Sequence, residues 1–326
     1  MITLVILIIL LALLFDFYNG MNDAANSIAT IVSTKVLTPK LAVLWAAFFN
    51  FLAAFFFGVK VASTMGKGIV NPSIVDSYLI LMAVISAILW TAIATHLGLP
   101  ISVSHSLIGG LIGIAFAKGG LKYIIFKGVF KILIFIALAP IIGFFFGIFL
   151  IILTTWIVKD FPPSKVDKYF RIFQLFSAAS YSLGHGTNDA QKTMGIISIL
   201  MYANGMLGDE FYVPFWVIIT CHLFIALGTL VGGWKVIKTL GIKITKLKPI
   251  DGFAAETASA ITLFGTAYAG IPVSTTHTIT GAIVGVGSTK RLSAVRWGIA
   301  ANIIFAWILT IPFTFFISFL LYEIFL

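Results

Sequence analysis

Four long, predominantly apolar segments constrain the fold of this chain more than any other feature. They cover residues 41–58, 78–97, 213–231 and 295–321, and they reach the roughly 20 residues that a helix needs to cross a bilayer. Lipid offers no partners to backbone groups, so spanning segments must be helices or closed barrels, and barrel strands are only about ten residues long. The chain is therefore predicted to be an all-α integral membrane protein, with about ten to twelve membrane helices.

Composition supports a multi-pass protein of the cell (plasma or inner) membrane. Charged residues make up 10% of the chain and its mean hydropathy is +1.11, whereas soluble domains carry about 25% charged residues. The net charge of +10 comes from lysines and arginines in short loops, which predicts contact with the lipid bilayer and no nucleic acid partner. The apolar first 15 residues lack a basic start and a cleavage site, so we expect a retained helix. Cys221 is the single cysteine, which excludes an intrachain disulfide.

Two polar motifs occur twice. GMNDA at residues 20–24 returns as GTNDA at 186–190, and GLPISVSHS at 98–106 returns as GIPVSTTHT at 270–278. Two further prolines, Pro140 and Pro312, are 172 residues apart, the same offset as the second motif. We expect two structural repeats, residues 1–160 and 165–326, within one intertwined unit. Duplicated polar interruptions in apolar segments indicate the central binding site of a transporter. The residues alone leave open whether the repeats are parallel or inverted.

Both motifs are expected to interrupt helices. Asn22 and Asp23 are poor helix formers and follow Gly20. Pro100 and Pro272 disfavour helix in the residue before them and suit the first turn of a new helix. Each proline motif therefore predicts two apolar arms around a polar tip, either a re-entrant hairpin or two full spans.

The Asn-Asp motifs predict cation binding. Buried ionised Asp23 and Asp189 are costly unless they are paired or bound to a cation. Amide oxygens and backbone carbonyls freed by a helix break are hard ligands that suit an alkali ion, so we expect Na⁺ at both aspartates. Glu256 is another acid in an apolar segment and has Val84 as its motif counterpart. The alternative is that each aspartate caps a helix or pairs with a lysine. The predicted cation ligands are Asn22, Asp23, Asn26, Asn188, Asp189 and Glu256.

The proline motifs predict anion binding. Hydroxyls and free N–H groups at a new helix N-terminus attract anions, although serine and threonine also cap helices or bond between them. We expect His105 and His277 to pack and not to bind the anion directly. We expect Lys192, the counterpart of Asn26, to pair with Asp189. The predicted phosphate-binding set is Ser102, Ser104, His105, Ser106, Lys192, Ser274, Thr275, Thr276, His277 and Thr278.

Charge balance predicts coupling of anion and cation movement. A divalent oxyanion beside Asp23, Asp189 and one lysine leaves a strongly negative site, which a low dielectric disfavours without co-bound cations or protons. We find no nucleotide-binding motif and expect no organic cofactor.

At these motifs the chain resembles the inorganic phosphate transporter (PiT) family over its whole length. That family carries duplicated G-x-N-D-[AV] and G-[IL]-P-[VI]-S-x-[ST]-H signatures. The resemblance implies cation-coupled phosphate uptake, two inverted repeats and a homodimer, with functional acids at Asp23, Asp189 and Glu256. The chain departs from many eukaryotic members at Asn50, where they have a glutamate.

The predicted function is Na⁺-coupled symport of inorganic phosphate by alternating access. The alternative within this class is an H⁺-coupled phosphate permease or a sulfate permease. An ion channel is a further reading, because fixed aspartates could line a pore. An enzyme is not expected, since the Ser-His neighbours occur in duplicate without a separate nucleophile motif.

Overall fold

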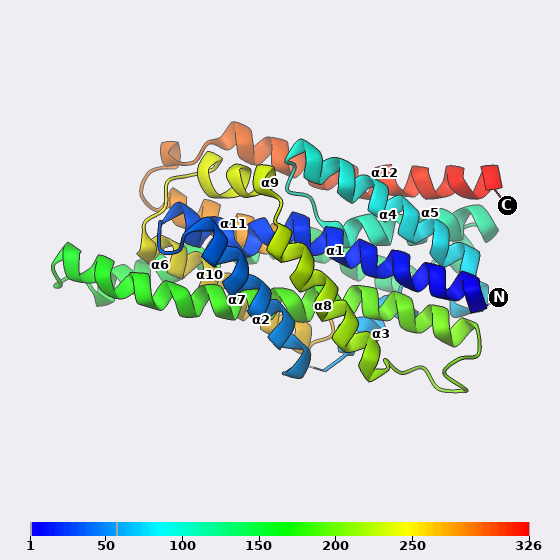
Figure 1. The fold of residues 1–326 in the computed structure, drawn as a ribbon. Coiled ribbons are helices and arrows are strands. Elements are labelled where there is room, and N and C mark those ends of the chain that lie inside the picture. The colour runs from blue at the N-terminus through cyan, green and yellow to red at the C-terminus, as the bar shows by residue number, and fades with distance from the viewer. Residues whose placement is uncertain (1, 57, 326) are drawn as a thin grey trace.

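The computed structural model describes residues 2–56 and 58–325, which form an elongated bundle of helices (Figure 1). No β-strand forms within these residues, apart from one isolated bridge between Val70 and Ile124. Both termini lie at one end of the bundle, and the turn between α6 and α7 lies at the other. The α-helices of the described residues are α1 (Ile2–Ser33), α2 (Pro39–Leu52), α3 (Lys60–Lys67), α4 (Ser77–Leu97), α5 (Val103–Gly119), α6 (Phe126–Ile157), α7 (Pro163–Ala203), α8 (Phe215–Val231), α9 (Trp234–Lys238), α10 (Pro249–Tyr268), α11 (Thr275–Ser288) and α12 (Trp297–Phe325).

Four of these helices, α1, α4, α6 and α12, are long and apolar enough to cross a membrane. Two bent pairs, α2 with α3 and α8 with α9, pass the same test only when each pair counts as one span, with bends of 83° and 66°. The described residues therefore offer four to six apolar spans, fewer than the membrane helices predicted. The long α7 carries many polar residues, and α5 and α11 are short.

The predicted helix breaks at the Asn-Asp motifs are wrong. The long helices α1 and α7 run without interruption through Asp23 and Asp189. Asn and Asp cost only about 0.7 kcal/mol each in a helix interior, whereas a break inside a membrane leaves backbone groups without partners. The carbonyls that a break would have freed as cation ligands therefore stay within the helices.

The glycines of these motifs permit close packing of helices instead. A Cβ atom on Gly186 would lie 2.5 Å from the backbone oxygen of Asn50 in α2. A Cβ atom on Gly20 would overlap the carbonyl of Ile225 in α8. Each Asn-Asp helix thus touches the backbone of a neighbouring helix at the turn that carries the motif.

The proline motifs do separate two helices each, but the prolines precede the new helices instead of lying in their first turn, because Ser102 and Ser274 cap α5 and α11. α4 ends at Leu97 and α5 begins at Val103, and α10 ends at Tyr268 and α11 begins at Thr275. Gly98 and Gly270 follow the ends with φ of +75° and +65°, a left-handed conformation that glycine adopts without strain. The two tips, residues 98–106 and 270–278, include the first turns of α5 and α11.

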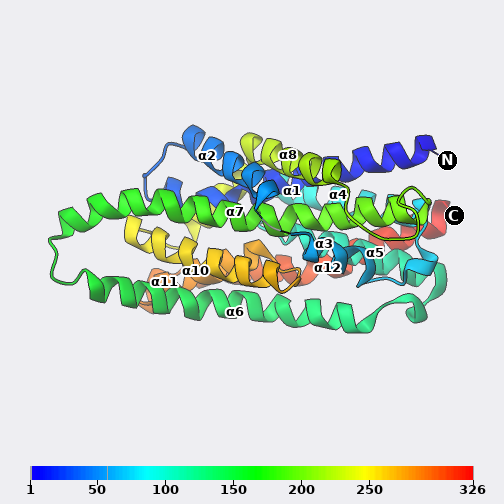
Figure 2. The same ribbon diagram turned by 90° about the horizontal axis from the view of Figure 1, so that it is seen from below.

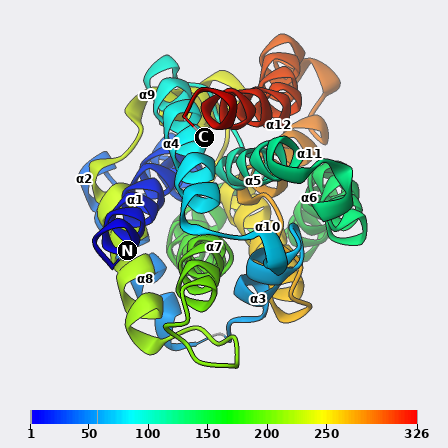
Figure 3. The same ribbon diagram turned by 90° about the vertical axis from the view of Figure 1, so that its right-hand side faces the viewer.

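The helices that follow the tips pack across the molecule. α5 lies against α12, and α11 lies against α6 (Figure 3). Figure 2 shows α10 between α6 and α7, and α10 packs on both. Each helix that follows a tip therefore packs on a proline-containing helix of the other half of the chain: α5 of the first half packs on α12, and α11 of the second half packs on α6.

α1 and α7 run antiparallel in the middle of the bundle. Thr193 Oγ1 donates to Asp16 Oδ1 at 2.7 Å, whereas Thr34 Oγ1 donates to Gln174 Oε1 at 2.8 Å. Ascending residue numbers on α1 thus meet descending numbers on α7. Because these helices carry the two copies of the same motif, the packing brings the two motifs together with their chain directions opposed.

Candidate functional site

Asp23 of α1 meets Asp189 and His185 of α7 at the centre of the antiparallel pair. One ligand atom from each of the three residues lies within 4.8 Å of the others. His185 Nε2 is 3.3 Å from Asp189 Oδ2 and 3.7 Å from Asp23 Oδ2. All three side chains are buried. Two buried carboxylates at this separation require positive charge between or beside them.

The other side of His185 bonds to Asn50. Its Nδ1 lies 3.0 Å from Asn50 Oδ1, and Asn50 Nδ2 donates to Thr229 Oγ1 at 3.0 Å. An amide oxygen only accepts, so Nδ1 is the nitrogen that carries the hydrogen. The Nε2 position that faces the two carboxylates is then left to a proton or to another cation. Asn50 thus sets the orientation of this ring.

Hydroxyls of the second tip close the cluster on one side. Thr275 Oγ1 donates to Asp189 Oδ2 at 3.1 Å and to Asp23 Oδ2 at 3.4 Å. Thr276 Oγ1 donates to Asp23 Oδ1 at 3.1 Å and accepts from Asn26 Nδ2 at 2.8 Å. The N-terminus of α11 is therefore attached directly to both Asn-Asp helices.

Lys192 connects the cluster to both tips. Its ammonium group forms an ion pair with Asp189, donates to Ser104 of the first tip, and donates to the carbonyl of Val273 in the second tip at 2.8 Å. The side chain is only 1% exposed. The pairing predicted for this lysine is confirmed, and the lysine also lies where the two tips meet.

The contacts of the two motifs are reciprocal. Asn26 bonds to Thr276, and its motif counterpart Lys192 bonds to Ser104, the counterpart of Thr276. The geometry is therefore repeated while the chemistry differs, with a neutral amide on one side and an ammonium group on the other.

The amide oxygens of the motifs have no donors. Asn22, Asn26 and Asn188 use their Nδ2 groups in hydrogen bonds, but within the described part of the chain none of their buried Oδ1 atoms has a partner. Such orphaned oxygens are rare in folded proteins. Together with carboxylates they form the set of hard oxygen ligands that alkali and alkaline-earth ions prefer.

The remaining tip residues have mostly structural contacts. Ser102 and Ser274 cap α5 and α11 by accepting the backbone N–H of His105 and His277, at 3.4 and 3.2 Å. Thr278 bonds back to the carbonyl of Ser274. The hydroxyl of Ser106 is buried and has no partner among the described residues.

The two tip histidines, His105 and His277, pack against each other, as predicted. Their rings meet edge to face with centroids 5.0 Å apart, and His277 stacks on Trp307 at 3.7 Å. The Nδ1 atom of His277 lies 3.3 Å from the carbonyl oxygen of Ile136.

Glu256 belongs to a separate cluster. Its carboxylate accepts from Thr30 at 2.5 Å, from Ser177 at 2.5 Å and from Gln174 at 3.0 Å. Thr30 lies seven residues beyond Asp23 on α1, which is about 10 Å along a helix. Of the predicted cation ligands, Glu256 is thus the one that the structure places two turns away from the aspartates.

Sequence reasoning missed four residues of these clusters. His185 stands four residues before Asp189, so helical spacing alone could have placed it beside that carboxylate. No local pattern marks Thr30, Gln174 or Ser177, because their contacts with Glu256 depend on how three helices pack.

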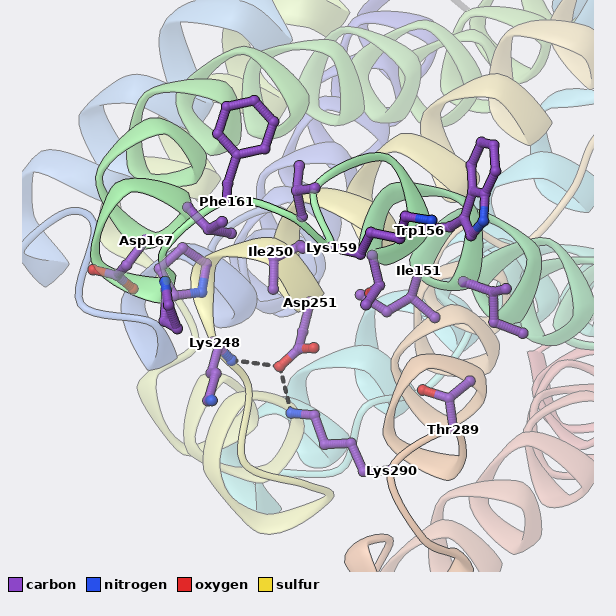
Figure 4. Close-up of a pocket in the computed structure, with 16 residues that line it drawn as sticks. Ile151, Trp156, Lys159, Phe161, Asp167, Lys248, Ile250, Asp251, Thr289 and Lys290 are labelled. Atoms are coloured by element: carbon purple, nitrogen blue, oxygen red, sulfur yellow. Dashed lines mark hydrogen bonds and ion pairs between the residues drawn. The ribbon is translucent and has the colours of Figure 1, made fainter.

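A surface cavity of about 990 Å³ lies away from this site, where the end of α6 meets the starts of α7 and α10 (Figure 4). Its lining combines apolar Ile151 and Trp156 with Lys159, Lys248 and Lys290. No residue of the duplicated motifs lines it. The cavity is therefore a feature of the basic end of the bundle and not an opening to the aspartates.

A helical bundle with membrane-length spans and a buried charged centre defines a membrane transport protein. The chain belongs to the phosphate transporter family, because residues 19–318 match the model of that family, PHO4. Relatives named "Probable low-affinity inorganic phosphate transporter" occur in Rhizobium meliloti, at 56% identity over 97% of this chain and 94% of the relative, and in Bacillus subtilis, at 43% identity over 95% and 93%. These proteins are transporters and not enzymes.

The fold matches a solved structure titled "The sodium-dependent phosphate transporter". The TM-score is 0.90 at 27% sequence identity, and the match covers 99% of this chain and 98% of the other.

Proposed function

We propose that this protein is a secondary transporter that moves inorganic phosphate together with Na⁺ by alternating access. The observation that carries the proposal is that two buried carboxylates, Asp23 and Asp189, share a single ion-paired lysine, Lys192. His185 Nε2 faces both carboxylates, and amide oxygens without donors come from both motifs. A cation bound among Asp23, His185 and Asp189 would compensate the two carboxylates, whose ligand atoms lie within 4.8 Å of one another. The sodium dependence named for the structural relative supports Na⁺ as that cation.

Asp23, Asp189 and the amide oxygens of Asn22, Asn26 and Asn188 are the proposed Na⁺ ligands. Lys192 and the hydroxyls of Ser104, Ser106 and Thr275 are the proposed contacts of phosphate. In this scheme Na⁺ binds first and offsets the carboxylates, which lowers the electrostatic cost of admitting a divalent anion beside them. Lys192 then exchanges part of its bond to Asp189 for one to phosphate.

Two inverted repeats, residues 1–160 and 165–326, are part of the proposal. The antiparallel contact of α1 with α7 supports inversion. Two equivalent hydrogen bonds between the halves also support it. Thr64 Oγ1 of the first half donates to the carbonyl of Gly270 in the second half, and Thr239 Oγ1 of the second half donates to the carbonyl of Gly98 in the first. The tips are then the broken or re-entrant elements of each repeat. Movement of one repeat against the other opens the buried centre to alternate sides.

Uptake of labelled phosphate into proteoliposomes under separately imposed Na⁺ and H⁺ gradients tests the proposal. We expect the Na⁺ gradient to drive accumulation, and Asp23→Asn to abolish it while the protein remains monodisperse. The matched control is Asp209→Asn in the exposed α7–α8 loop, which should transport normally. Uptake driven only by the H⁺ gradient would establish the alternative coupling, and full activity of Asp23→Asn would remove the site assignment. Competition by excess sulfate separates phosphate from sulfate selectivity.

The cell membrane location and a homodimer complete the proposal. The homodimer rests on the family resemblance, and light scattering of the purified protein with the detergent contribution subtracted measures it. A protein mass of one chain per particle, near 35 kDa, would refute it.

A further inference from the structure

Asp16 is a buried acid that the proposed transport site does not use. It lies on α1 with 0% of its surface exposed, seven residues before Asp23 and thus about 10 Å along the helix. It belongs to neither duplicated motif, and its counterpart at the motif offset is Ser182. An ionised carboxylate in such a position costs several kcal/mol unless a cation compensates it.

The surroundings of Asp16 contain oxygen ligands but no cationic side chain. Thr193 Oγ1 of α7 donates to Asp16 Oδ1 at 2.7 Å. The side chains of Asn19, one turn further along α1, and of Cys221 in α8 also form hydrogen bonds with the carboxyl group. Among the described groups that act on Asp16, the only other charged one is the carboxylate of Asp189. No lysine, arginine or histidine therefore offsets this acid.

Two oxygen atoms at this position have no hydrogen-bond partner in the part of the chain that is described. They are Asp16 Oδ2 and Asn19 Oδ1, and Asn19 is 1% exposed. A buried amide oxygen next to a buried carboxylate oxygen, both without donors, lacks the partners that buried polar groups normally have. A small hard cation would accept lone pairs from both atoms and from the hydroxyl of Thr193.

The position also continues a spacing along α1. Asp16, Asp23 and Thr30 are seven residues apart, so two helical turns separate each from the next and all three lie on one face. Thr193, Asp189 and Glu256 meet this face through their contacts with those residues. Carboxylates therefore lie along this face at three levels, which are Asp16, the Asp23–Asp189 pair, and Glu256 of α10, which accepts from Thr30.

We propose that Asp16, Asn19 and Thr193 form a further Na⁺ site, located between the central aspartates and the end of the bundle that holds the termini (Figure 1). The choice of Na⁺ rests on the proposed function, but occupancy of the site does not require phosphate or transport.

Equilibrium binding of ²²Na⁺ to the purified protein, without phosphate, tests this site. We expect Asp16→Asn to bind one Na⁺ per chain fewer than the wild type, and Asp209→Asn to bind the same number. Asp23→Asn is expected to lose the central Na⁺ and keep the one at Asp16. Asp16→Asn with wild-type stoichiometry would overturn the proposal and identify Asp16 as a neutral, protonated residue. Loss of binding in Asp16→Asn but not in Asp23→Asn would instead count against the proposed central site alone.

Thermal unfolding supplies a second readout that a purely structural role would not produce. Asparagine keeps the shape and still accepts from Thr193, and it removes an uncompensated charge. Without Na⁺, Asp16→Asn should therefore unfold at the same or a higher temperature than the wild type, and added Na⁺ should stabilise it less. A lower unfolding temperature without Na⁺, with an undiminished Na⁺ response, would contradict the assignment. Asn19→Leu, which removes a different ligand, should show the same reduced Na⁺ response.

Discussion

Replacement of Lys192 by methionine should destabilise the protein through the charge that it leaves behind. The ammonium group is paired with Asp189, and both side chains are 1% exposed. Breaking a buried ion pair by removing one partner costs about 3–5 kcal/mol, because the other charge stays buried without compensation. For a large domain about 1 kcal/mol corresponds to about 2 °C in unfolding temperature, so we expect Lys192→Met to lower it by roughly 6–10 °C.

The double variant Lys192→Met/Asp189→Asn separates charge from packing. It removes both charges and keeps side chains of similar size, so that only hydrogen bonds such as that to the Val273 carbonyl are lost. These are worth about 1–2 kcal/mol together, so the double variant should recover most of the unfolding temperature. Both variants should lack phosphate uptake, since each lacks the ammonium group.

The assay is differential scanning fluorimetry of the detergent-purified proteins at low and high salt, followed by proteoliposome uptake. Lys127→Met is the matched control, because Lys127 is an exposed lysine at the start of α6, and it should leave both readouts unchanged. Equal destabilisation by the single and double variants would refute the reasoning, since it would mean that packing and not the unpaired carboxylate sets the cost.

Five further variants test the packing of the motifs, the Glu256 cluster and the hydrogen bonds to the two tips. Gly186→Ala should cost about 1–3 kcal/mol from overpacking against the α2 backbone, whereas Gly265→Ala, with open space at its Cβ, should stabilise α10 slightly; unfolding temperatures compare them. Glu256→Gln should lower the unfolding temperature, because the hydrogen bonds that Thr30, Ser177 and Gln174 donate to the Glu256 carboxylate are charge-assisted and such bonds are worth about 1.5–3 kcal/mol; an unchanged unfolding temperature would contradict this reading of the cluster. Thr64→Val and Thr239→Val should each lower the free energy of unfolding by about 1 kcal/mol. Clearly unequal losses would argue against the equivalence of the two hydrogen bonds that these threonines donate to the tips.

Local patterns in the sequence determined the class of protein and the positions of the tips. Apolar segments of membrane length predict helices wherever they occur, and each proline acts on the residues next to it. The ends of α4 and α10 therefore fall where the sequence predicts them, whereas α5 and α11 start three residues after the prolines that the sequence predicts in their first turns. The duplicated motifs likewise marked both aspartates, because a repeated acid in an apolar chain has few roles other than binding.

Local patterns failed where tertiary contacts outweigh propensity. The Asn-Asp motifs predict helix breaks, but α1 and α7 continue through them, since the small cost of polar residues in a helix is less than that of unpaired backbone in a membrane. Their glycines serve the close approach of neighbouring helices.

Only the tertiary structure decided which of the marked residues act together. Asp23 and Asp189 are 166 residues apart in the chain, and they meet at His185 because α1 and α7 pack antiparallel. The same packing separates Glu256 from them by two helical turns and brings Asp16 to Thr193. The sequence specifies the chemistry of each side chain, whereas the distances between side chains that a binding site requires depend on how the helices pack.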